Sequence, residues 1–149
     1  MNPFFDSTSS YFRLAGRALI AALFLVAGWG KINGYAATQA YMQSAGVPGG
    51  LLPLVILLEL GGGVAIVTGC CTRLAALLLA GFSVVAALFF HAGSPDPMQQ
   101  IMFLKNLGLA GGFLFLAADG AGRISIDHLW KTRRERRAQG LPTPHGSYH

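Results

Sequence analysis

The sequence LLPLVILLELGGGVAIVTG, residues 51–69, carries a single ionisable side chain, Glu59, in an otherwise apolar and glycine-rich run. About 20 such residues are enough to cross the ~30 Å hydrocarbon core of a bilayer as a helix. Three further runs occur at residues 14–30, 74–91 and 101–119. Because lipid offers backbone amides and carbonyls no partners, and these runs are too long and continuous for barrel strands, they predict four transmembrane helices.

The composition of the whole chain supports a membrane protein. Of the 149 residues, 53% are hydrophobic and 11% are charged, whereas a soluble domain has about 25% charged residues. An ordinary soluble globule is therefore excluded, and the length allows about one domain. The predicted fold is an all-α, four-helix transmembrane bundle over residues 14–127. Residues 1–13 precede it, and the basic segment 128–149 follows it as a tail that we expect to be disordered.

The distribution of positive charge predicts the orientation of the bundle. Lys31 and Lys105 lie toward one side of the four spans, and nine basic residues lie on the other: Arg13, Arg17, Arg73, Arg123, Lys131, Arg133, Arg134, Arg136 and Arg137. The positive-inside rule then places both termini in the cytoplasm. The first span could instead be a signal peptide, but no clear small-x-small cleavage site follows Trp29, so we expect it to be retained.

The loop between the first two spans, residues 35–46, allows two interpretations. Tyr35, Tyr41 and Met42 are interspersed with alanine and glutamine, a composition that suits a short helix at the level of the lipid headgroups with its tyrosines as anchors. An irregular loop is equally compatible with the sequence.

Five polar positions in the outer half of the spans are the candidate site: Lys31, Glu59, His91, Lys105 and the amide Asn106. An ionisable group at the centre of a span costs about 2.5–3.5 kcal/mol, so each one needs an explanation. All four spans contribute to the set. The sequence therefore predicts a polar pocket toward the outside, suited to binding a ligand or relaying protons.

Residue spacing suggests how these groups pair. Lys105 shares a helical stripe with Gly108 and Gly112, so we expect it to face the bundle interior. A buried carboxylate without a partner would cost several kcal/mol, and the simplest partner for Glu59 is then Lys105, with His91 and Lys31 nearby. In the alternative interpretation, a Glu59–Lys105 pair only fixes helix register, Lys31 extends to the interface and His91 caps its helix.

Other motifs carry little functional signal. Adjacent Cys70 and Cys71 would form a strained disulfide ring, and we interpret them as structural. The histidines lack metal-ligand spacing, so no metal or haem site is expected. Gly61-Gly-Gly63 lies within a span and predicts helix packing rather than phosphate binding. The basic residues flank the spans, which fits attraction to anionic lipid without invoking nucleic acid.

The order of several short motifs over residues 12–130 resembles the DoxX family of small bacterial four-helix membrane proteins. The motifs are Gly28-Trp-Gly-Lys31-Ile-Asn-Gly34, Glu59, Gly69-x-x-Thr72-Arg73-Leu74, His91, Phe103-x-Lys105-Asn106 and Gly122-x-Ile124-Ser125-Ile126-Asp127. The resemblance implies a bacterial inner-membrane location and a redox association, including links to quinone-dependent sulfur oxidation and oxidative stress. It supplies no agreed catalytic residues, so the polar positions carry over without assigned roles.

We therefore expect a redox-associated membrane component that binds a lipophilic molecule such as a quinone in the outer pocket, with no covalently bound cofactor. At most it would be a subunit of a quinone-linked oxidoreductase system, with the electron carrier supplied by the quinone or by a soluble redox partner. Two alternatives remain open. One is a small-solute transporter acting as a homo-oligomer, and the other is a non-catalytic scaffold that recruits soluble proteins through the basic tail.

Overall fold

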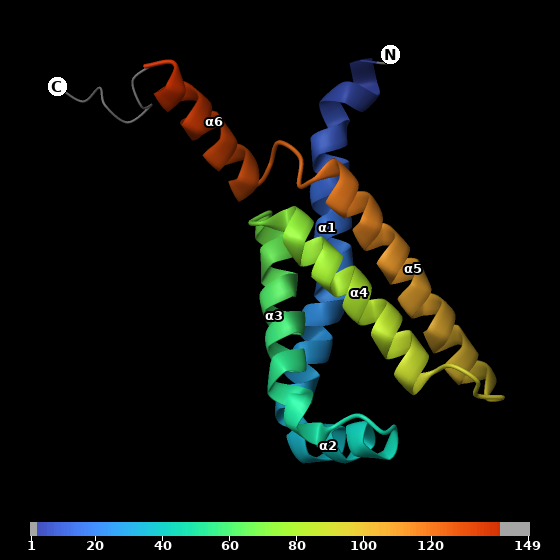
Figure 1. Ribbon diagram of the computed structural model, residues 1–149. Helices are drawn as coiled ribbons and strands as arrows, with labels where there is room; N and C mark the ends of the chain where they lie inside the picture. Colours follow the sequence, from blue (N-terminus) through green and yellow to red (C-terminus); the bar gives the residue numbers. More distant parts are fainter. Residues whose placement is uncertain (1–2, 141–149) are drawn as a thin grey trace.

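The structure, a computed structural model, describes residues 3–140 and contains only helical elements within that range (Figure 1). Four of these helices, α1, α3, α4 and α5, are long and apolar enough to cross a membrane, which confirms the predicted spans. The elements are α1 (Pro3–Asn33), α2 (Tyr35–Ser44), the 3-10 turn η1 (Gly49–Leu51), α3 (Leu52–Thr68), α4 (Thr72–Phe90), α5 (Pro97–Asp119) and α6 (Ile126–Ala138).

The bundle has two distinct ends. The "α6 end" contains the start of α1, the α3–α4 turn and α6, and the "α2 end" contains α2 and the α4–α5 loop (Figure 1). Both ends of the described chain lie at the α6 end, as an even number of spans requires. Large apolar side chains remain exposed along the spans, as expected where lipid surrounds them, among them Leu19 and Phe115.

Local sequence explains where the spans begin and end. Pro53 lies in the first turn of α3, where a missing N–H does no harm. The same helix ends at Gly69, which adopts the left-handed conformation with φ 70°. Asp96 caps α5 by accepting a hydrogen bond from the Met98 amide at 3.1 Å, and Pro97 follows it.

Glycines allow the spans to approach closely. A Cβ at Gly63 would lie 2.8 Å from a methyl carbon of Leu25 on α1, and a Cβ at Gly62 would lie 3.0 Å from Leu79 on α4. The packing role predicted for Gly61-Gly-Gly63 is thus confirmed for Gly62 and Gly63, whereas a Cβ at Gly61 would meet nothing within 4 Å. Across the bundle, Phe24 of α1 meets Phe113 of α5 edge to face, with ring centroids 5.3 Å apart.

Two segments outside the spans are helical. In the first loop, α2 confirms the short-helix interpretation over the irregular one. In the tail, the expectation of disorder is wrong for residues 128–138, because α6 continues to Ala138. The reason is local: Ser125 Oγ accepts a hydrogen bond from the His128 amide and caps the helix, and the residues that follow favour helix. Residues 141–149 of the tail lie outside the described residues.

Candidate functional site

The central polar contact of the bundle joins Lys31, in the last turn of α1, to Glu59 of α3. Lys31 Nζ donates a hydrogen bond to Glu59 Oε1 at 2.8 Å and lies 2.8 Å from Oε2. Glu59 is almost fully buried, with 3% of its surface exposed. Gly28, one turn before Lys31, permits this approach, because a Cβ there would lie 3.3 Å from Glu59 Cβ and closer still to Leu60. The contact is thus a desolvated ion pair between two spans.

The prediction that Glu59 pairs with Lys105 is wrong, because Lys31 contacts both of its carboxylate oxygens. The prediction that Lys105 faces the interior is also wrong. Its side chain is exposed and its Nζ lies 3.2 Å from Met102 Sδ on the same helix. Of the two glycines in its predicted stripe, a Cβ at Gly108 would meet open space, whereas a Cβ at Gly112 would lie 3.2 Å from Ile20 of α1, so only Gly112 faces another span. Asn106, the next residue, is half-buried on α5.

His91 forms a second polar feature at the α2 end, where it terminates α4. Its Nδ1 lies 2.6 Å from Gln99 Oε1, so the ring donates its Nδ1 proton to the amide oxygen. A cavity of about 300 Å³ opens beside the ring, lined by His91, Ala92, Gly93, Ser94, Gln100, Phe103 and Leu104. That volume is at the lower end for small-molecule sites, and it joins polar groups to an apolar wall.

The helix α2 links the ion pair to the histidine. It begins at Tyr35, four residues after Lys31, and its Tyr41 stacks on Phe90 with ring centroids 5.3 Å apart. Phe90 in turn precedes His91 and contacts its ring. The structure therefore brings only Lys31 and Glu59 of the predicted site into contact. The cavity beside His91 is lined by none of the other four predicted residues.

Sequence reasoning missed a polar network at the α6 end, where Asp127 closes the α3–α4 turn. Its carboxylate accepts hydrogen bonds from the amides of Cys71 at 2.7 Å and Thr72 at 2.9 Å, and its own amide donates to Gly69 at 2.9 Å. Burial by itself raises the pKa of Asp127, but these amide bonds and the charge of Arg17 outweigh it, so the pKa is lowered. Asp127 thereby caps α4 from outside the helix.

Arg17 of α1 belongs to the same network and is 2% exposed. Its Nη2 donates to the Ile124 carbonyl at 2.6 Å, which ties α1 to the segment before α6. In the sequence this arginine reads only as a charge that flanks the first span. Its position three residues into the first apolar run was the available signal, because an ionisable group within a span calls for a partner.

Taken together, the four apolar helices, the buried ion pair and the capped turn define a small multi-pass membrane protein with polar groups at both ends of its bundle. The DoxX family model matches residues 12–92. Inner membrane protein YqjF of Escherichia coli (strain K12) is 54% identical over 116 residues, which cover 78% of this chain and 89% of that protein. Inner membrane protein YphA of the same organism is 33% identical over 121 residues, covering 76% and 86%. No solved structure matches this chain.

The chain belongs to the DoxX family, and it is an integral inner-membrane protein of that type. The resemblance drawn from the order of the short motifs is thereby confirmed. The structure also explains two of those motifs, since Gly69-x-x-Thr72 and the segment that ends in Asp127 form the capped turn.

Proposed function

We propose that this protein binds a lipophilic molecule with a polar ring, of the quinone class, at the α2 end of its bundle. One observation carries the proposal: the cavity beside His91 combines polar side chains with the apolar wall of Phe103 and Leu104. Such a combination suits a polar headgroup whose hydrocarbon tail continues into lipid. The volume of about 300 Å³ fits a headgroup rather than a whole lipid.

The hydrogen bond from His91 to Gln99 supports this assignment chemically. Because Nδ1 donates to the amide oxygen, Nε2 of the neutral ring keeps its lone pair and can accept a hydrogen bond from a hydroquinone hydroxyl. Protonation of the ring would turn Nε2 into a donor for a quinone carbonyl. A histidine held in this way suits both redox forms of the ligand. In this proposal the electrons come from a redox partner, and the chain provides binding and proton exchange.

Binding of a short-tailed ubiquinone analogue to the full chain in nanodiscs tests the proposal. We expect His91→Ala to weaken binding about tenfold, or about 1.4 kcal/mol, and Phe103→Ala to weaken it by removing the apolar wall. His128→Ala is the matched control, because His128 lies on α6 at the opposite end, and it should bind like the wild type. Equal binding by His91→Ala and the wild type, or no binding by the wild type, would refute the proposal.

A scaffold function has one observation in its favour. None of the 13 residues of α6 is buried, and α6 extends away from the bundle (Figure 1). Its basic residues are therefore free to meet a soluble protein. Removal of residues 128–149 separates the two functions, because quinone binding should survive this truncation while recruitment through α6 should be lost.

A further inference from the structure

The turn between α3 and α4 carries the two cysteines of the chain, Cys70 and Cys71, next to each other and both as free thiols. Cys71 is exposed and Cys70 is half-buried. The turn lies at the α6 end, between Thr68 and Thr72, and is therefore outside the apolar spans (Figure 1). The pair can thus be reached from outside the bundle, at the end opposite to the cavity beside His91.

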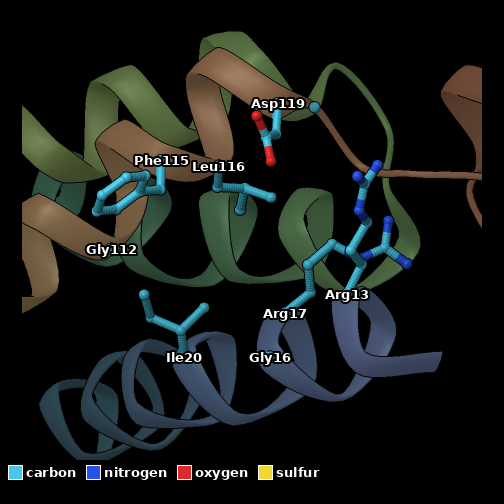
Figure 2. A pocket seen from close by; sticks show the side chains of 9 residues that line it. Arg13, Gly16, Arg17, Ile20, Gly112, Phe115, Leu116 and Asp119 are labelled. Atoms are coloured by element: carbon cyan, nitrogen blue, oxygen red, sulfur yellow. The ribbon is translucent and has the colours of Figure 1, made fainter. Parts of the chain in front are cut away.

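The thiols are also separate from a second cavity at the α6 end, which lies between α1 and α5. Figure 2 shows Arg13 and Arg17 of α1 and Asp119 of α5 around that cavity, and neither cysteine lines it. The described residues 3–140 contain no group of three or more His, Cys, Asp or Glu side chains that could hold a metal ion. Within them, a ligand of the cysteines has to be held by two sulfur atoms.

Hydrogen bonds fix the backbone around both cysteines. The Cys70 amide donates to the Ala65 carbonyl at 3.0 Å, and the Cys71 amide donates to the Asp127 carboxylate at 2.7 Å. Cys71 also adopts the left-handed conformation, with φ 49° and ψ 38°, which glycine adopts without strain and other residues rarely adopt. The turn therefore holds two adjacent thiol side chains on a fixed backbone.

The two sulfur atoms are close to each other. Burial, a hydrogen bond with the Cys71 thiol and the charges of Cys71 and Asp127 together raise the pKa of Cys70. Cys70 is therefore a neutral S–H group at neutral pH. A direct disulfide is disfavoured, because consecutive Cα atoms are about 3.8 Å apart and disulfides usually join Cα atoms at least about 4.4 Å apart. An atom from a ligand that binds both sulfurs avoids this restriction.

The carboxylate of Asp127 indicates which bridging atom suits the pair. A soft monovalent metal ion such as Cu(I) binds thiolates, so both thiols would lose their protons and the complex would carry a net negative charge beside Asp127. A trivalent arsenical needs no thiolate. When an arsonous acid, R–As(OH)2, reacts with two thiols, two As–S bonds form and two As–O bonds break, and each thiol proton leaves with a hydroxide as water. No electron is transferred, and the product is neutral.

We propose that Cys70 and Cys71 form a dithiol site for a trivalent arsenical, whose arsenic atom bridges the two sulfur atoms. The exposed Cys71 thiol makes the first As–S bond, and the adjacent Cys70 thiol makes the second. The second step is intramolecular, so it benefits from the high effective concentration that two neighbouring groups have for each other. The site depends neither on the ion pair of Lys31 and Glu59 nor on the cavity beside His91.

Intact-mass spectrometry of the reduced and desalted full chain in detergent tests this site, with phenylarsine oxide as the probe. We expect one phenylarsenic group per chain, which stays bound in excess 2-mercaptoethanol and is released by the competing dithiol 2,3-dimercaptopropanol. Binding should weaken at least about 100-fold in Cys70→Ser and in Cys71→Ser, because each variant keeps a single sulfur. Retention of the probe should be equal at about pH 6 and pH 8, because the reaction releases water and no proton, whereas binding of a metal ion by thiolates releases protons.

A variant with two separated thiols is the matched control. Cys71→Ser combined with Gln139→Cys keeps two cysteines per chain but places one on the turn and the other after α6, at an exposed position. This variant should lose the probe to 2-mercaptoethanol as the single variants do, and a Tm near that of the wild type verifies that it folds. The proposal is overturned if the wild type binds no probe or loses it to 2-mercaptoethanol, if the separated pair retains it equally well, or if equimolar Cu(I) displaces it.

Discussion

Lys31 Nζ lies 2.8 Å from both carboxylate oxygens of Glu59, yet the two side chains differ in exposure, with 25% for the lysine and 4% for the glutamate. The lysine can therefore reach the bundle surface without its partner, and the glutamate cannot. Because of this difference in exposure, removing the charge of the lysine should cost more free energy of unfolding than removing the charge of the glutamate.

Lys31→Met should destabilise the protein more than Glu59→Gln does. The first change leaves a buried carboxylate without its cation and should lower the free energy of unfolding by about 3 kcal/mol. The second leaves a lysine that can extend toward the interface. Titration with a denaturing detergent measures the free energy of unfolding of both variants. Lys105→Met is the control, expected within about 0.5 kcal/mol of the wild type, and a loss for Lys31→Met no greater than this would contradict the prediction.

Gly69→Ala should destabilise the protein strongly, because Gly69 has φ 70° and a Cβ there would overlap Arg17 Nη1 and Ser125 Cβ. We expect a loss of at least about 1–3 kcal/mol from backbone strain, to which the steric overlap adds. Gly81→Ala on α4 is the matched change, since its Cβ would meet open space in a helix. It should be neutral or stabilising by up to about 1 kcal/mol. Similar Tm values for the two variants would be evidence against the described turn.

Asp127→Asn should remove a pH-dependent part of the stability. The side-chain nitrogen of the asparagine cannot accept the second of the two amide hydrogen bonds that cap α4. At pH 7 we therefore expect the free energy of unfolding to fall by about 1–2 kcal/mol. The pKa of Asp127 is lowered in the folded protein, so its stabilisation is fully present above the unfolded value near about pH 4 and is lost as the pH falls through the folded value. The Tm difference between wild type and variant should be constant from neutral pH downward and shrink only below that point. A difference that instead shrinks near pH 6 would rule out this carboxylate as the cause.

Tyr41→Ala should loosen α2 from the end of α4 by removing the stack on Phe90. The free energy of unfolding should fall by about 0.5–1.5 kcal/mol in addition to the contribution of the apolar area that the ring buries. Hydrogen exchange of the α2 amides should become faster, while that of α3 stays the same. Tyr35→Ala, at the start of the same helix, provides the aromatic control. Unchanged exchange in Tyr41→Ala would show that the stack does not hold α2.

The sequence by itself determined the four spans, the helical class and the burial of Glu59. Each depends on the composition of one continuous segment, and lipid leaves such a segment few structural choices. It also placed Lys31, Glu59, His91 and Lys105 at similar depths, because depth follows from counting residues along each helix.

Only the tertiary structure decided which of those groups meet. Lys31 and Lys105 are both candidates for Glu59 by depth, and the choice depends on the packing of α1 against α3 through Gly28, a relationship between segments that hydropathy does not contain. The same holds for Arg17 and Asp127, whose 110-residue separation in sequence hides a shared network at the α6 end. Partner choice is set by the relative rotation and contact of helices, and these follow from side-chain packing across the whole bundle.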